Sequence, residues 1–129
     1  EAPGAGAAGG PGYAFLQYFN AEARPGAELL LNEIGFDALI LDADLVITGE
    51  GHSDKQTLMG KLPQRILEHV TNQKIWQVSG GVSDRKAMLD AGFDRVVQVT
   101  PEEMPLDEAM KPEVARNNII KAIREQFAL

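Results

Sequence analysis

From residue 43 onward, short apolar runs alternate with segments whose apolar residues lie three or four positions apart. The runs are 45–48, 75–78 and 95–99, all rich in Val and Ile. Continuous β-branched runs are typical of strands buried on both faces, whereas the wider spacing is typical of amphipathic helices. The resulting β-α-β-α-β-α order predicts an α/β fold, a parallel sheet with helices on both faces, because crossovers between parallel strands are right-handed.

Proline, serine and glycine residues set the predicted helix boundaries in this region. Pro63 and Pro112 lie at the starts of the first and third helices, where a missing N–H costs nothing. Ser83 is predicted to N-cap the second helix and Gly92 to end it. The acidic segment 102–108 is predicted to be a loop before the last helix.

Residues 1–42 have a different pattern. They begin with glycines and alanines, too flexible for a helix interior and therefore predicted to form a loop. Two helices are predicted next, one beginning near Pro11 and one at Pro25 that ends at Gly35. The chain is thus divided into a glycine-rich loop with helices, 1–42, and a Rossmann-like β/α unit, 43–129.

Composition restricts the classes of function. The chain has 129 residues, 44% hydrophobic and 24% charged, as expected for one globular domain. Its net charge of −7 argues against nucleic acid or anionic lipid as a partner, and no apolar run approaches the length of about 18 residues that spans a membrane. The absence of cysteine fits a reducing compartment, so we expect a cytoplasmic protein. Because the chain begins with Glu1 and carries no secretory signal, we expect it to be part of a larger protein.

The segment 43–61 carries the most candidate chemistry. The buried run is expected to break after Thr48 into an acidic turn flanked by glycines. Glu50 and Asp54 are residue types that hold Mg²⁺ or orient a hydroxyl for phosphoryl transfer. They can equally form a solvated acidic turn, with Asp54 capping local N–H groups. Gln56 and Thr57 can bind a polyol or cap the next helix. The spacing leaves these alternatives open.

Other motifs are weaker. Gly4, Gly6 and Gly9 match the letters G-x-G-x-x-G, and together with Gly10 they can form either a phosphate loop or a flexible end. Lys61 is either a cation facing a ligand or a solvated lysine, and a Walker A loop is excluded because Leu62 stands where Ser or Thr should be. His52 and His69 lack the spacing of a zinc site, so His52 is either a ligand contact or an exposed turn residue.

Three blocks of sequence, 3–10, 24–28 and 43–61, resemble in order and spacing the C-terminal portion of the bacterial-type glycerate kinase family. The third block is similar to the family's D-L-V-I-T-G-E-G run, followed by R-x-D-x-Q-T and G-K. Two departures stand out. His52 replaces the family's usual arginine, although a protonated histidine can still donate to an anion, and the turn 79–81 reads Ser-Gly-Gly where the family tends to have Ala-Gly.

The resemblance implies a two-domain kinase whose N-terminal part is a further partner of this chain. It implies ATP-dependent phosphorylation of D-glycerate to 2-phosphoglycerate, assisted by Mg²⁺. Glu50 or Asp54 would hold the metal or orient the hydroxyl, and Gln56 and Thr57 would bind substrate oxygens. The further contacts to substrate or phosphate would come from the residues Gly4, Gly6, Gly9, Gly10, Gly49, Gly51, His52 and Lys61. The alternative is a non-catalytic α/β fragment or a small-ligand-binding module; the oligomeric state stays open.

Overall fold

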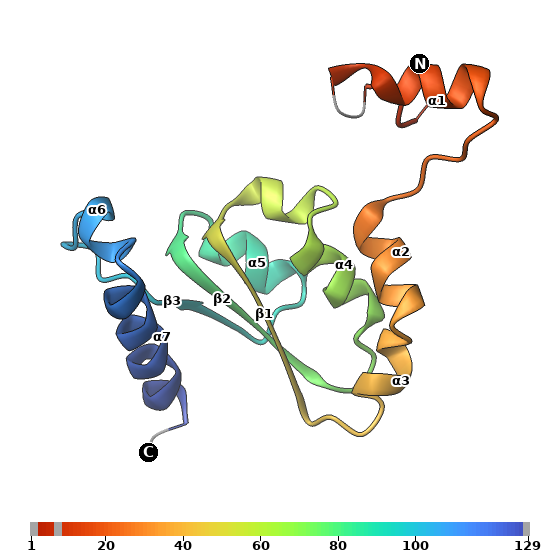
Figure 1. Ribbon diagram of the computed structural model, residues 1–129. Coiled ribbons are helices and arrows are strands. Elements are labelled where there is room, and N and C mark those ends of the chain that lie inside the picture. The colour runs from red at the N-terminus through yellow and green to blue at the C-terminus, as the bar shows by residue number, and fades with distance from the viewer. Residues whose placement is uncertain (1–2, 7–8, 128–129) are drawn as a thin grey trace. The chain divides into compact units, whose positions relative to one another are not determined.

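A parallel three-stranded sheet organises the larger part of the molecule (Figure 1). The strands are β1 (Leu45–Ser53), β2 (Lys74–Val82) and β3 (Arg95–Gln98), and they lie side by side in the order β1-β2-β3. The computed structural model describes residues 3–6 and 9–127, which divide into two units, 1–36 and 37–129. The predicted parallel α/β fold is confirmed for the second unit.

One face of the sheet is covered by the two crossover helices, α4 (Leu62–His69) and α5 (Arg85–Ala91). Their apolar side chains enclose the main core, whose buried members are Ile75, Met88, Phe93 and Val96. Burying such a side chain contributes about 1.5–3 kcal/mol. These residues come from α5, β2, β3 and the turn between them, so the core joins each crossover to its strands.

The opposite face carries α7 (Pro112–Gln126), which follows β3 (Figure 1). Trp76 alternates with the core residue Ile75 and therefore points to this second face. Its ring lies 5.1 Å from that of Phe127, and the guanidinium of Arg95 stacks 4.8 Å from the Trp76 ring centroid. Helices on both faces are thus confirmed.

The first two strands are longer than their apolar runs. The predicted turn after Thr48 is wrong, because β1 continues to Ser53 and pairs with β2 as far as Val82. Close backbone packing explains this: a Cβ on Gly49 would lie 2.5 Å from the Val78 carbonyl oxygen. Only residues without side chains allow that approach, and side-chain periodicity cannot detect them.

The turn instead begins at Asp54 and enters a short 3₁₀ helix, η2 (Lys55–Leu58), before α4. Both predicted proline starts are confirmed, since Pro63 and Pro112 occupy the first turns of α4 and α7. Gly92, with φ +121°, ends α5 as predicted.

Two predicted boundaries are wrong, the one before α5 and the one in the segment after β3. Ser83 does not cap α5. The residue directly before α5 is Asp84, and its side chain makes no capping hydrogen bond. The Ser83 hydroxyl bonds His52 instead. The acidic segment contains α6 (Leu106–Ala109), which begins after Pro105, a residue whose fixed φ favours a helix start.

The N-terminal unit consists of turns and two helices, α1 (Pro11–Tyr18) and α2 (Gly26–Glu33). Gly35, with φ +64°, follows α2 as predicted. The exposed Arg24 guanidinium lies 2.7 Å from Glu22 and lowers the pKa of that carboxyl. The predicted loop falls partly on residues 1–2 and 7–8, which lie outside the described residues.

A short helix, α3 (Phe36–Ile40), precedes β1. Within residues 3–6 and 9–127, no helix has both the length and the apolar content needed to cross a membrane.

Candidate functional site

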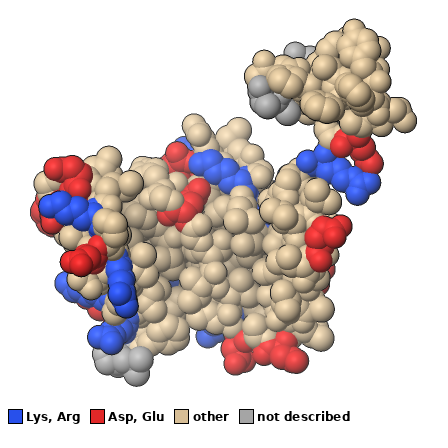
Figure 2. Space-filling model, in the orientation of Figure 1, with Lys and Arg blue, Asp and Glu red and all other residues tan. Residues whose placement is uncertain are grey.

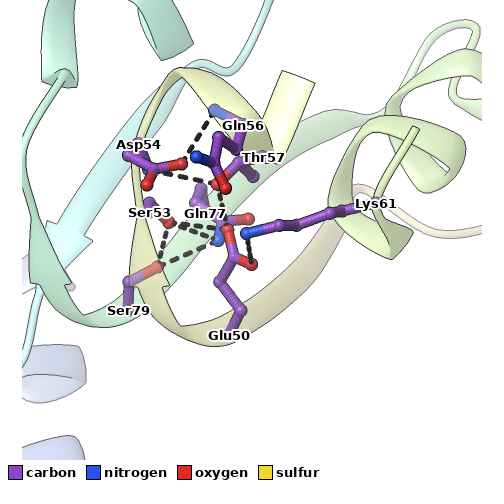
Figure 3. A network of polar contacts seen from close by, with 8 residues as sticks. All are labelled: Glu50, Ser53, Asp54, Gln56, Thr57, Lys61, Gln77 and Ser79. Carbon is purple, nitrogen blue, oxygen red and sulfur yellow. Dashed lines mark hydrogen bonds and ion pairs between the residues drawn. The ribbon is translucent and has the colours of Figure 1, made fainter. Parts of the chain in front are cut away.

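A hydrogen-bonded carboxylate, Glu50, lies near the end of β1 with its side chain 17% exposed (Figure 3). Its Oε1 accepts a hydrogen bond from the Thr57 hydroxyl and another, 3.2 Å long, from Ser53. Its Oε2 lies 3.7 Å from the Lys61 ammonium. Donors on one oxygen and a cation beside the other hold the carboxylate in one orientation.

A buried polar cluster lies behind this carboxylate. The hydroxyls of Ser53 and Ser79 bond each other, and the Gln77 amide nitrogen donates to both, at 2.8 and 2.9 Å. All three side chains are buried. Buried polar groups are costly unless they are paired, so their presence between two strands points to a role in holding Glu50. Gln77 Oε1 has no hydrogen-bond partner among the described residues.

Asp54 and Thr57 close the turn after β1. The Asp54 carboxylate accepts a 2.8 Å bond from the backbone N–H of Gln56, and the Asp54 N–H donates to Thr57 Oγ1 at 3.1 Å. This reciprocal capping box stabilises the start of η2. The capping alternative for Asp54 is therefore realised, while the half-buried carboxylate stays beside the Glu50 network.

Thr57 is completely buried. Its hydroxyl donates to Glu50 and accepts a hydrogen bond from the Asp54 N–H, so the capping role is realised, while a contact of Thr57 with substrate stays a prediction. The pattern could not distinguish these two roles, because a capping threonine and a ligand-binding threonine occupy the same position. Gln56, in contrast, is exposed.

Lys61 is the residue before α4, where a cation interacts unfavourably with the helix dipole. The ion pair with Glu50 offsets that cost, and the Lys61 side chain remains 44% exposed. Lys61 is therefore neither an isolated surface lysine nor a buried one. It is a cation fixed at the rim of the network.

His52 lies on β1 and not in a turn. Its Nε2 is hydrogen-bonded to the Ser83 hydroxyl, 2.7 Å away, and its ring lies against Gly81, where a Cβ would come within 2.6 Å of Nδ1. The side chain thus links the ends of β1 and β2. The reading of His52 as an exposed turn residue is corrected to an exposed strand residue.

The glycines of the site differ in their surroundings. Gly49 packs against the backbone of Val78, whereas a Cβ on Gly51 would meet no atom within 4 Å. Gly4 and Gly6 lie in a turn of the N-terminal unit, and Gly9 and Gly10 have positive φ values just before α1. That these four glycines bind phosphate stays a prediction.

The sequence interpretation missed Ser53, Gln77 and Ser79. One signal was present: Gln77 interrupts the apolar run 75–78, and a polar residue inside a buried strand needs a partner. No cluster of three or more potential metal-ligating side chains exists among residues 3–6 and 9–127.

A cavity of about 560 Å³ opens beside Glu50, at the carboxyl ends of all three strands. One wall is the sheet, with Gly51 and Gly80, and the other is formed by α6 and the first half of α7. In open parallel sheets, ligands bind outside the carboxyl ends of the strands. The polar network and this cavity therefore form a candidate ligand site in the second unit.

An α/β fold with a carboxylate and a lysine at this edge is compatible with enzymes that bind small anionic substrates. The model of the glycerate kinase family matches residues 1–129, and the chain belongs to that family. The resemblance seen in the three sequence blocks is confirmed.

Individual relatives agree. The chain is 40% identical over 120 residues to a glycerate kinase of Bacillus cereus and 34% identical over 127 residues to the glycerate 2-kinase of Escherichia coli, covering 91% and 96% of this chain. It covers 31% and 33% of those relatives. A crystal structure of a putative glycerate kinase 2 from Salmonella typhimurium matches with a TM-score of 0.55 at 28% identity, over 98% of this chain and 33% of that one. The chain thus spans about a third of the length of its relatives.

Proposed function

We propose that the whole protein carrying this chain transfers the γ-phosphoryl group of ATP to the 2-hydroxyl of D-glycerate and forms 2-phosphoglycerate. Membership of the glycerate kinase family supports the kinase class. The observation that carries the proposal to this chain is the Glu50 carboxylate, held by Ser53 and Thr57 and paired with Lys61 beside a cavity.

Phosphoryl transfer depends on positioning and on neutralising charge. In the proposed reaction Glu50 orients the glycerate hydroxyl through Oε2, since Oε1 already accepts two hydrogen bonds. As the bond between this oxygen and the γ-phosphorus forms, the bond from the γ-phosphorus to the bridging oxygen of ADP breaks, ADP leaves, and Glu50 takes the hydroxyl proton. Lys61 sits beside the same oxygen with its ammonium exposed, where it can bind the substrate carboxylate or a phosphoryl oxygen.

Mg²⁺ is the metal expected with ATP. It is usually held by one or two carboxylates together with the nucleotide phosphates. Glu50 and Asp54 supply that kind of donor set, so either can hold the metal. When bound, Mg²⁺ would neutralise the negative charge of the nucleotide phosphates.

The remaining side chains have secondary roles in this proposal. Gln56 is exposed beside the network and can bind oxygens of glycerate. Thr57 acts through Glu50. Gly49 and Gly51 allow the backbone to approach the ligand. His52 stands where the family has arginine, and can donate to an anion when protonated.

The direct test is product formation. The whole protein, supplied with ATP, Mg²⁺ and D-glycerate, is expected to form 2-phosphoglycerate, identified and distinguished from the 3-isomer by ³¹P NMR. Glu50→Gln should lower kcat by about 10²–10⁴-fold, the usual effect of a positioned acid or base. Glu113→Gln, the same change at an exposed residue of α7, is the control. Near-normal turnover by Glu50→Gln would refute the role of this carboxylate.

The competing proposal is a non-catalytic α/β fragment or a small-ligand-binding module. It is favoured by the observation that the chain spans only about a third of the length of its relatives. Assaying the 129-residue chain beside the whole protein separates the two. Product from the whole protein alone means that the chain needs its partner segment. No product from either would support the binding module.

A further inference from the structure

The cavity at the carboxyl ends of the strands contains two chemically different regions. Glu50 and Gly51 line it on the sheet side, where it adjoins the polar network. Across from them it is lined by apolar side chains of α6, of α7 and of the segments beside them, among them Met104, Met110 and Ile119. Met110 is 72% exposed and Ile119 46% exposed, so part of this apolar wall faces solvent.

The walls are unsuited to a small anion. None of the described residues that line the cavity is Lys or Arg, and two of them, Glu50 and Glu102, are acidic. Glycerate or a phosphate group placed against the methionines would lose hydration without gaining a cation. Lys61 is the cation that pairs with Glu50 at the network, and it does not line the cavity.

The walls suit a flat, neutral group with polar edges. Thioethers of methionine contact aromatic rings favourably and adapt to their shape. Asn118 and Thr100 place an amide and a hydroxyl among the apolar side chains, and the Asn118 amide is oriented by a 3.4 Å contact with Met104 Sδ. The volume of about 560 Å³ falls within the range of pockets that enclose small ligands.

We infer that this cavity binds the purine base and ribose of the nucleotide, with the phosphates directed toward Glu50 and Lys61. The inference rests on the proposed function, since it assigns a place to the ATP that the reaction needs. Base contacts would come from Met104, Met110 and Asn118. Gly51 lies between the base and the phosphates, where its lack of a side chain keeps the cavity open.

Adenosine is the appropriate probe, because it has neither phosphates nor a need for Mg²⁺. We expect adenosine, titrated into the isotope-labelled whole protein that carries this chain, to shift the amide NMR signals of Gly51, Asn118 and Ile119. D-glycerate should leave Asn118 and Ile119 unchanged. Absence of adenosine binding, shifts confined to other residues, or glycerate shifts at these two positions would each overturn the inference.

Two variants fill the cavity from opposite walls. Ala115→Leu enlarges a side chain that lines it on α7, and Gly51→Ala adds a methyl group at a position with free space. Each should weaken adenosine binding about tenfold or more, equivalent to ~1.4 kcal/mol. Asn117→Leu places the same leucine two residues along α7, at an exposed position outside the cavity, and should bind as the unmodified chain does.

The second variant protects the test against misfolding, since Gly51→Ala requires no repacking even if Ala115→Leu disturbs α7. Unchanged affinity in a folded Gly51→Ala chain and a folded Ala115→Leu chain would contradict the inference. Failure of this inference can be told apart from failure of the proposed function. If adenosine binds elsewhere while the whole protein still forms 2-phosphoglycerate, only the inference fails. If adenosine binds in the cavity but no 2-phosphoglycerate forms, only the proposed function fails.

Discussion

At the scale of single residues, Glu50 illustrates how neighbouring side chains hold one carboxylate in a fixed orientation. The carboxylate is on β1, and its partners come from the end of the same strand, from η2 and from the residue before α4. Thr57 and Ser53 hold one oxygen, and Lys61 lies beside the other. A carboxylate held in this way is ready to orient a hydroxyl without first reorganising its surroundings.

At Asp54, the effect of the negative charge on turnover can be tested separately from the effect of the N-cap on stability. Asparagine is as good an N-cap as aspartate, so Asp54→Asn should retain the capping box. In the whole protein we expect turnover to fall by orders of magnitude while the free energy of unfolding changes by less than about 0.5 kcal/mol. Steady-state kinetics and urea denaturation would measure the two quantities.

The matched control is Asp90→Asn, which removes an exposed carboxylate of α5 that pairs only with Lys86 among the contacts described. It should alter neither quantity. If Asp54→Asn kept normal turnover, Asp54 would be a cap and nothing more.

At the scale of elements, the ends of β1 and β2 depend on glycine. The two strands stay paired to Ser53 and Val82 because Gly80 approaches the carbonyl oxygen of Gly51, so that an added Cβ would lie only 2.5 Å from it. The polar cluster between the strands therefore exists only while this close pairing is maintained.

Gly80→Ala should separate the strand ends and weaken the bonds between Ser53, Ser79 and Gln77. We expect a loss of stability of about 1–3 kcal/mol, typical of forcing extra atoms into a packed site. Gly51→Ala, on the facing strand but with free space around it, should cost much less. Thermal unfolding of both variants would show the contrast, and equal midpoints would mean that the close approach is unimportant.

At the scale of the whole molecule, the second unit has a helix layer on each face, but its sheet is only partly covered. The face toward the viewer over β1 and β2 shows few Lys, Arg, Asp or Glu side chains (Figure 2). Ile47 of β1 is 48% exposed. Stability must therefore come mainly from the covered face, where Ile75 and Met88 lie.

Met88 tests this conclusion. It is fully buried on α5, so Met88→Ala should destabilise the unit by about 2–5 kcal/mol, a large part of the stability of a small domain. Its neighbour Leu89 is 43% exposed, and Leu89→Ala should cost far less. Urea denaturation of the chain would measure both, and a small loss for Met88→Ala would show that the core lies elsewhere.

The order of the elements was determined by the sequence itself. The β-branched runs located the starts of the strands, and Pro63, Pro112 and Gly92 located helix ends, because each of these signals is local to its own segment. The glycerate kinase resemblance was likewise readable from the three sequence blocks, and it named Glu50 and Lys61 as candidates.

Tertiary structure alone decided the rest. The strands extend past their apolar runs because neighbouring backbones pair there, and glycine has no side-chain pattern to reveal it. Ser53, Gln77 and Ser79 meet only when β1 lies beside β2, and the cavity exists only when α6 and α7 stand against the strand ends. Each of these features depends on contacts between residues distant in the chain, and a local pattern carries no information about such contacts.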